Sequence, residues 1–219
     1  MISAYLEPLA LKIKDIFSSD SSGHDFDHLQ RVVSLALKIQ ETEGGDALVI
    51  AAAALLHDLH RLRENKTGEF CAPVETLPQA KVLLESVQFP TERIDPVLHC
   101  IEHHEQYSFS KGGKTVTDIE TLILQDADNL DAMGAIGIAR TFAFSGAHAV
   151  PFWTPEVPFD RLFYDEKLRD PSVLHHFHSK LLRLKESMNT ETGKQMAERR
   201  HLVMESYVEE FMREWKGVV

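Results

Sequence analysis

The chain has 219 residues, with 23 lysines and arginines against 34 aspartates and glutamates, and a formal net charge of −11 at pH 7. A chain of this length is expected to form one domain with a sizeable core. Its acidic balance, with no basic run longer than Arg199–Arg200, argues against a nucleic-acid polymer or a membrane surface as partner.

Two cysteines, Cys71 and Cys100, are too few for a disulfide framework, and neither belongs to a CxxC pair. The longest apolar run, Ala47 to Leu56, is about half of the roughly 20 residues that a membrane span needs. The first residues carry acidic side chains at helical spacing and do not read as a signal peptide. We therefore expect a soluble protein of the cytoplasm.

Apolar residues recur at helical spacing from one end of the chain to the other, and no alternating β-branched run competes with them. This pattern predicts an all-α fold of about eight helices. The spacing is clearest at the two ends, in Ile2, Leu6, Leu9, Ile13 and Ile16, and in Met196, Val203, Tyr207, Phe211 and Trp215.

The most apolar of these predicted helices spans Asp46 to His60 and should lie at the centre of the fold, since "ALVIAAAALL" is apolar on every side. His57 and Asp58 stand at its end, where an unpaired buried charge would cost several kcal/mol. Taken alone, the pair fits either a polar helix end or two ligands of a metal ion.

Two other segments contain side chains that could complete a metal site. "GHDFDHLQRV" opens a predicted helix, and "LILQDADNLDAMGA" places three acids in an otherwise apolar helix, where a solvated face is hard to form. The candidates are His24, Asp25, Asp27 and His28 in the first segment, and Asp126, Asp128 and Asp131 in the second.

One long stretch, Ser145 to Pro171, does not read as helix, because it contains four prolines and five aromatic residues. A connection of this length inside a compact domain is usually functional or disordered. Its aromatic content predicts that the loop packs against the rest of the molecule.

The order and spacing of five segments resemble those of the HD-domain metal-dependent phosphohydrolases, and most closely the stand-alone bacterial branch that is similar to nucleotide pyrophosphohydrolases. The resemblance implies a single HD domain over residues 1–219, with core motifs at about 20–131 and C-terminal helices at 172–217. The segments are "GHDFDHLQRV", "AALLHDL", "IEHHEQYSFSKGG", "LQDADNLDAMGAIGIARTFAFSGAHAVP" and "HFHSKLLRLKESMNTETGKQMAERR".

By position in these motifs, the resemblance implies that one divalent metal ion is held by His28, His57, Asp58 and Asp128. Two imidazoles and two carboxylates make a mixed nitrogen and oxygen shell. Such a shell suits manganese or magnesium, which we favour, and also iron, cobalt, nickel or zinc. Histidines at 175 and 178 share a helix face and offer a second arrangement, but the family resemblance accounts for that segment without a metal.

The resemblance also implies that a metal-activated water attacks phosphorus. One histidine of the pair His103 and His104 would donate a proton to the leaving group, and Asp58 is placed with them among the catalytic residues. The candidates for contact with the substrate phosphates or the pocket are Arg31, Lys111, His148, Lys180 and Arg200.

The leading prediction is hydrolysis of nucleoside or deoxynucleoside triphosphates, by a monomer or homodimer. Positions after the central pair hold His60, Arg61 and Leu62, where guanosine-tetraphosphate hydrolases and 5′-nucleotidases of the superfamily have acids, and no "GYP" segment is present. Two alternatives stay open: hydrolysis of a nucleoside monophosphate or cyclic phosphodiester, and a non-catalytic protein that binds nucleotide or metal.

Overall fold

The computed structural model describes residues 2–18, 23–110, 115–159, 164, 167–168 and 170–218. Over these residues the fold is all-α, as predicted, with ten α-helices and two short 3-10 helices. The elements are α1 (Ile2–Ile16), α2 (Phe26–Glu43), α3 (Ala47–Leu56), α4 (Leu59–Thr67), η1 (Pro73–Thr76), α5 (Leu77–Ser86), α6 (Thr91–His103), α7 (Ile119–Asp131), α8 (Gly134–Ala147), α9 (Val173–Ser179), η2 (Leu181–Ser187) and α10 (Glu191–Trp215).

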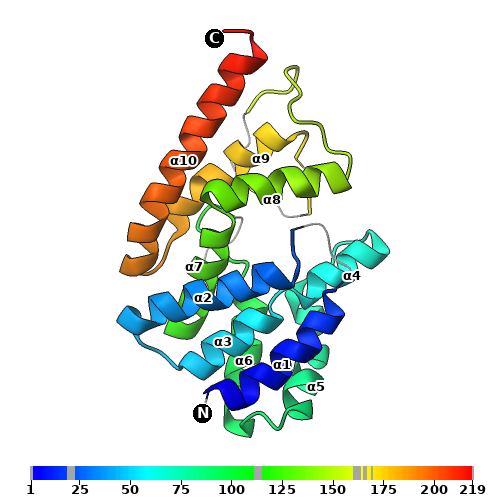
Figure 1. Ribbon diagram of the computed structural model, residues 1–219, viewed down its shortest axis with the longest axis vertical. Helices are drawn as coiled ribbons and strands as arrows, with labels where there is room; N and C mark the ends of the chain where they lie inside the picture. The colour runs from blue at the N-terminus through cyan, green and yellow to red at the C-terminus, as the bar shows by residue number, and fades with distance from the viewer. Residues whose placement is uncertain are drawn as a thin grey trace.

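Helix α3 is the centre of the first half of the fold. Its residues from Leu48 to Leu56 are all buried, and it packs against α1, α2, α6 and α7. Figure 1 shows these helices gathered at one end of the molecule, with α8, α9 and α10 at the other end and α7 between the two groups. Because α7 contacts α2, α3 and α6 as well as α8 and α10, side chains from both groups can meet around it.

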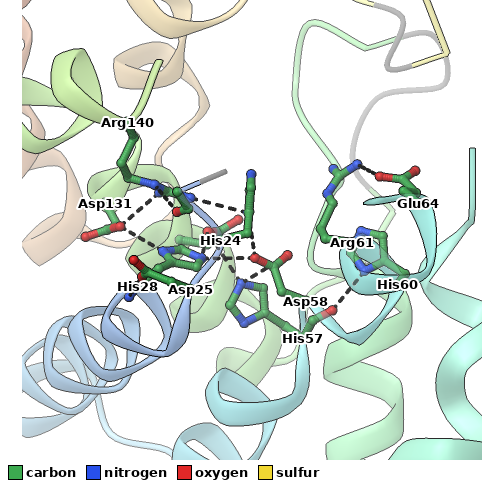
Figure 2. A network of polar contacts seen from close by, with 12 residues as sticks. His24, Asp25, His28, His57, Asp58, His60, Arg61, Glu64, Asp131 and Arg140 are labelled. Atoms are coloured by element: carbon green, nitrogen blue, oxygen red, sulfur yellow. Dashed lines mark hydrogen bonds and ion pairs between the residues drawn. The ribbon is translucent and has the colours of Figure 1, made fainter. Parts of the chain in front are cut away.

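The predicted helix over residues 46–60 is interrupted at its polar pair. α3 ends at Leu56 and α4 begins at Leu59, with Asp58 between them at φ −92° and ψ 14°. An unbroken helix would point neighbouring side chains about 100° apart. The turn instead lets His57 and Asp58 face the same group of side chains, as Figure 2 shows.

Asp126 has a structural task that the sequence did not reveal. Its carboxylate accepts hydrogen bonds from the backbone N–H groups of Asn189 and Thr190, both at 2.8 Å, and from the Thr190 hydroxyl at 2.7 Å. Thr190 is the N-cap of α10. The buried Asp126 therefore joins α7 to the start of α10, and is not a candidate metal ligand.

The aromatic loop packs against the molecule, as predicted, in the part that the structure describes. Its first residues up to Ala147 belong to α8, and the described residues between α8 and α9 form no helix. Phe152 lies edge-to-face with Phe142, and Trp153 with Trp215 of α10. Tyr164 is half-buried and packs against the core.

The described helices include no segment that is both long enough and apolar enough to cross a membrane.

Replacing Gly193 by alanine tests the junction between α7 and α10. A Cβ at this position would lie 2.4 Å from Asp126 Oδ2 and 2.9 Å from Thr190 Oγ1. We expect Gly193→Ala to lower the free energy of unfolding by about 1–3 kcal/mol in chemical denaturation. The matched control is Gly146→Ala in α8, where nothing lies within 4 Å. This control should be neutral or stabilising, and equal effects of the two changes would contradict the assignment.

Candidate metal centre

The four predicted metal ligands come together at the junction of three helices. His28 lies in the first turn of α2, His57 and Asp58 occupy the break after α3, and Asp128 lies in the last turns of α7. The side chains of His28 and His57 are fully buried and that of Asp58 nearly so, whereas 21% of the Asp128 side chain is exposed. The cluster is therefore enclosed by protein and reaches solvent at Asp128.

The distances between the ligand atoms fit a divalent ion. His28 Nε2 is 3.1 Å from Asp58 Oδ2 and 3.6 Å from Asp128 Oδ1. His57 Nε2 is 3.6 Å from both Asp58 Oδ1 and Asp128 Oδ1. Ligand atoms at about 2.1 Å from one ion are separated by about 3.0–3.5 Å in octahedral or tetrahedral shells. Ligand atoms of His28, His57 and Asp128 lie within 4.8 Å of one another, and Asp58 approaches the two histidines with different oxygens, so a shift of Asp58 would bring a fourth ligand to the same ion.

The two histidines present unpartnered nitrogens to this space. His57 Nδ1 donates to the Ala54 carbonyl at 2.9 Å, and His28 Nδ1 donates to Asp131 Oδ2 at 2.8 Å. Both Nε2 atoms are buried, and no residue that the structure describes gives them a hydrogen bond. Metal-binding histidines characteristically use their second nitrogen in this way. The site thus fits a divalent metal ion on its geometry and on its donor atoms.

Asp131 supports the site from behind and was not among the predicted ligands. Besides His28, its carboxylate accepts hydrogen bonds from Arg31 Nε at 2.8 Å and from Arg140 at 2.9 Å. Burial alone would raise the pKa of Asp131, but the bonds from His28 and Arg31 outweigh burial and lower the pKa to about 2. Asp131 therefore stays ionised and holds the His28 ring in place.

Electrostatics favour positive charge at the centre of the cluster. Burial alone would lower the pKa of His57, but the carboxylates of Asp58 and Asp128 outweigh burial and raise it to about 9. The protein without metal accordingly keeps a proton on His57 at neutral pH. A bound cation would displace this proton, because a metal ligand must present a lone pair.

His24 extends the cluster toward a cavity. Its Nδ1 donates to Asp58 Oδ2 at 2.7 Å, and 27% of its side chain is exposed. Burial lowers the pKa of His24 more than the neighbouring Asp58 carboxylate raises it. The sequence made His24 a candidate for the metal site, but the family resemblance did not place it among the four ligands; it lies just before Asp25, the N-cap of α2.

The cavity has a volume of about 480 Å³ and lies between α4, α8, α9 and the aromatic loop. None of the four ligand residues lines it, and His24 is the link between the cavity and the cluster. Its charged lining has more cations than acids: the cations are Arg61, Arg140, Lys167 and Lys180, the acids are Glu64, Glu69 and Asp170, and the imidazoles are His24, His148 and His176. A volume of this size suits a small molecule the size of a nucleotide.

Two of the predicted substrate contacts lie at this cavity. Lys180 places Nζ 4.7 Å from the centre of the Tyr107 ring and 5.2 Å from that of Tyr164. His148 stacks on Phe144 with ring centroids 4.0 Å apart. Both residues therefore stay candidates for contact with a ligand in this cavity.

The other predicted substrate contacts do not lie at the cavity. Arg31 donates to Asp131, and Arg200 donates to the Leu130 carbonyl. Both arginines line a different, open pocket next to α2. Their guanidinium groups hold helix α7 and its carboxylate, which corrects the prediction that they bind substrate phosphates. Lys111 lies outside the described residues.

The two histidines at the end of α6 differ in burial: His104 is buried and His103 is partly exposed. His104 is buried, and its ring lies 5.0 Å from that of His57 in an edge-to-face contact. His103 turns away and contacts His99 and Gln106. Burial lowers the pKa of His104 to about 4. His104 is therefore neutral at pH 7, which argues against the prediction that it donates a proton to the leaving group.

The alternative metal site at residues 175 and 178 finds no support. His175 is hydrogen-bonded at both nitrogens, to Ser172 at 2.7 Å and to the Val157 carbonyl at 2.9 Å. It has no lone pair to offer an ion.

Removing the charge of Asp131 tests its support of the site. Asp131→Asn weakens the bond that orients His28, and changes of this kind cost about 10–100-fold in metal affinity. We expect a loss of this size for Mn²⁺ in isothermal titration calorimetry. Asp27→Asn is the control, because Asp27 is an exposed acid in the same turn of α2 as His28. An affinity for Asp131→Asn equal to that of the control would show that the bond does not matter.

Comparison with known proteins agrees with this geometry. The family model for the HD domain matches residues 25–133. An uncharacterized Bacillus subtilis protein, YpgQ, is 36% identical over 214 residues, which cover 97% of this chain and 94% of YpgQ.

Solved structures agree as well. A Lactobacillus plantarum protein is similar with a TM-score of 0.84 at 31% identity, over 97% of both chains. An HD-superfamily hydrolase from Bacillus thuringiensis is similar with a TM-score of 0.71 at 36% identity, over 99% of both chains. The structure of YpgQ in complex with ADP has a TM-score of 0.65 at 33% identity, over 96% of this chain and all of that one. The histidines and aspartates assembled here, together with relatives that span the whole chain, establish that this protein belongs to the HD-domain family.

Proposed function

We propose that this protein is a metal-dependent phosphohydrolase that cleaves nucleotides, with nucleoside or deoxynucleoside triphosphates as its substrates. The observation that carries the proposal is the four-residue cluster beside a cavity lined by cationic side chains. A divalent ion bound there would lower the pKa of a bound water and neutralise phosphate oxygens.

His24 is the residue best placed to accept a proton. Its Nδ1 donates to Asp58, which leaves the other ring nitrogen as the acceptor on a side chain that lines the cavity. The lowered pKa keeps this ring neutral at pH 7. A neutral histidine within reach of both the ligand cluster and the substrate can act as a general base. This role differs from the acid role that the sequence indicated for His103 or His104, because it concerns the attacking water and not the leaving group.

Lys180 supplies charge for the phosphates. Its ammonium group rests on two tyrosine rings at the cavity wall and forms no ion pair with any carboxylate that the structure describes. Arg61 and Arg140 also line the cavity, but their charges are largely neutralised by Glu64, Glu105 and Asp131. Of these three cations, Lys180 is therefore the one that a leaving pyrophosphate or phosphate would meet with least competition from carboxylates.

Two further observations support a nucleotide as the ligand. The stacked rings of Phe144 and His148 form an aromatic wall of the cavity, on which a base can stack. The relative YpgQ has been crystallised with ADP, and it is similar to this chain over nearly its whole length.

A panel of nucleotides tests the proposed reaction. We expect purified protein with Mn²⁺ to release pyrophosphate or phosphate from at least one nucleoside triphosphate. The released product is measured by ³¹P NMR. Asp58→Ala should lower kcat/KM by at least about 10³-fold, because it removes a ligand and the partner of His24. Nucleoside monophosphates and cyclic phosphodiesters belong in the panel as competing substrates. No turnover of any phosphate ester would refute the proposal.

The two adjacent histidines offer a matched pair of variants. His104→Gln should lower kcat by about tenfold or more, because the buried His104 ring packs against the ligand His57. His103→Gln should stay within about twofold of the native rate, because His103 faces away from the cluster. A larger loss for His103→Gln than for His104→Gln would contradict the assignment.

A further inference from the structure

A second group of side chains that could hold a metal ion lies beside the four-residue cluster, and the proposed reaction gives it no chemical step. It consists of His60 in the first turn of α4 and of His104 and Glu105 just after α6. His60 is fully buried, His104 is 2% exposed, and the Glu105 side chain is 10% exposed. In Figure 2, His60 and Arg61 lie on the opposite side of Asp58 from His28.

Both histidines of this group are held in the tautomer that a metal ligand requires. His60 Nδ1 contacts the His57 carbonyl at 3.0 Å, and His104 Nδ1 contacts the Ile101 carbonyl at 2.7 Å. A carbonyl oxygen can only accept, so each Nδ1 carries a hydrogen, and in the neutral ring each Nε2 then has the lone pair. His57 is held to the Ala54 carbonyl in the same way. In the second group, as at His57, a backbone carbonyl therefore orients each histidine ring.

Three acceptor atoms face one another without a donor. His60 Nε2, His104 Nε2 and Glu105 Oε2 are buried, and none is hydrogen-bonded by any residue within the described ranges. The contact between His60 and Glu105, at 3.4 Å, is longer than an ordinary hydrogen bond. One water has only two hydrogens for three acceptors. A cation satisfies all three, and leaving a buried acceptor unsatisfied costs about 1–3 kcal/mol.

The spacing of these atoms fits a tetrahedral ion. All three lie within 4.8 Å of one another, and the 3.4 Å between His60 Nε2 and Glu105 Oε2 equals the separation of about 3.4 Å in a tetrahedral zinc shell. Two histidines and one glutamate form a common zinc ligand set, with water as the fourth ligand. Closure around an ion would require His104 Nε2 to come to about 3.4 Å from the other two ligand atoms, from separations that are at most 4.8 Å.

The charges around the group allow a divalent cation. Arg61 binds the other oxygen of Glu105, and its charge opposes a second cation. Glu64 also binds Arg61, at 2.7 Å, so two carboxylates surround one guanidinium group. The three side chains together carry one net negative charge. Arg61 thus orients Glu105 without cancelling the charge that an ion would meet.

We propose that His60, His104 and Glu105 form a second metal site, specific for a zinc-like divalent ion with nitrogen and oxygen ligands. The site is separate from the cluster of His28, His57, Asp58 and Asp128. Because it rests only on the geometry of its own three side chains, it does not depend on the proposed hydrolase activity.

Metal content tests the proposal without any activity assay. The full chain is stripped with a chelator, dialysed against Zn²⁺, freed of unbound metal and analysed by mass spectrometry. We expect about two equivalents in the native protein and about one in His60→Asn and Glu105→Gln. His60→Asn keeps a donor near the Nδ1 position and removes Nε2. Glu64→Gln is the matched control, because Glu64 also binds Arg61 but does not face the histidines, and it should keep about two equivalents.

Asp128→Ala isolates the second site, since it damages only the first cluster, and it should keep about one equivalent. Co²⁺ added to this variant should give the visible absorption of a tetrahedral site, and Glu105→Gln in the same background should abolish it. A native protein with one equivalent that both His60→Asn and Glu105→Gln retain would overturn the proposal. So would two equivalents retained in both His60→Asn and Glu105→Gln, because the ion would then bind His57, Asp58 and His104 instead. A thermal melt of each variant shows that the folded protein was measured.

Discussion

The arrangement of this protein depends on the electrostatic repulsion among the buried hydrogen-bond acceptors of His28, His57, Asp58 and Asp128. At the junction of α2, α3 and α7, two imidazole lone pairs and two carboxylates point into one space, and burial makes their charge expensive. The raised pKa of His57 is the response of the protein without metal, because a proton there supplies part of the missing positive charge. A divalent ion would supply more, which explains why an otherwise apolar core tolerates this cluster.

The surrounding fold keeps these side chains from moving apart. The break between α3 and α4 turns His57 and Asp58 toward the same centre, and Asp131 fixes His28 from behind with the help of Arg31 and Arg140. Asp126, from the same helix as Asp131, ties α7 to α10. The acids of α7 therefore divide into one ligand candidate, one support for a ligand and one structural anchor. The three side chains, Asp128, Asp131 and Asp126, point in different directions from the axis of α7.

Much of this arrangement could be predicted from the sequence. Helical spacing predicted the all-α fold, and the ordered motifs predicted which four side chains would meet. The sorting of the α7 acids could also have been predicted, because at 100° per residue Asp128 and Asp131 lie about 60° apart while Asp126 lies about 160° from Asp128. What sequence could not supply are contacts between distant segments, such as Arg140 with the Gly23 carbonyl, or Arg31 with Asp131 instead of a phosphate.

The central claim is that His28, His57, Asp58 and Asp128 hold one divalent ion. The most direct measurement is anomalous X-ray diffraction at the manganese edge, from crystals grown with Mn²⁺. Our account predicts an anomalous peak about 2.0–2.3 Å from both Nε2 atoms and from one oxygen of each carboxylate. A well-ordered cluster without an anomalous peak, or with these four side chains directed away from the bound manganese, would contradict it.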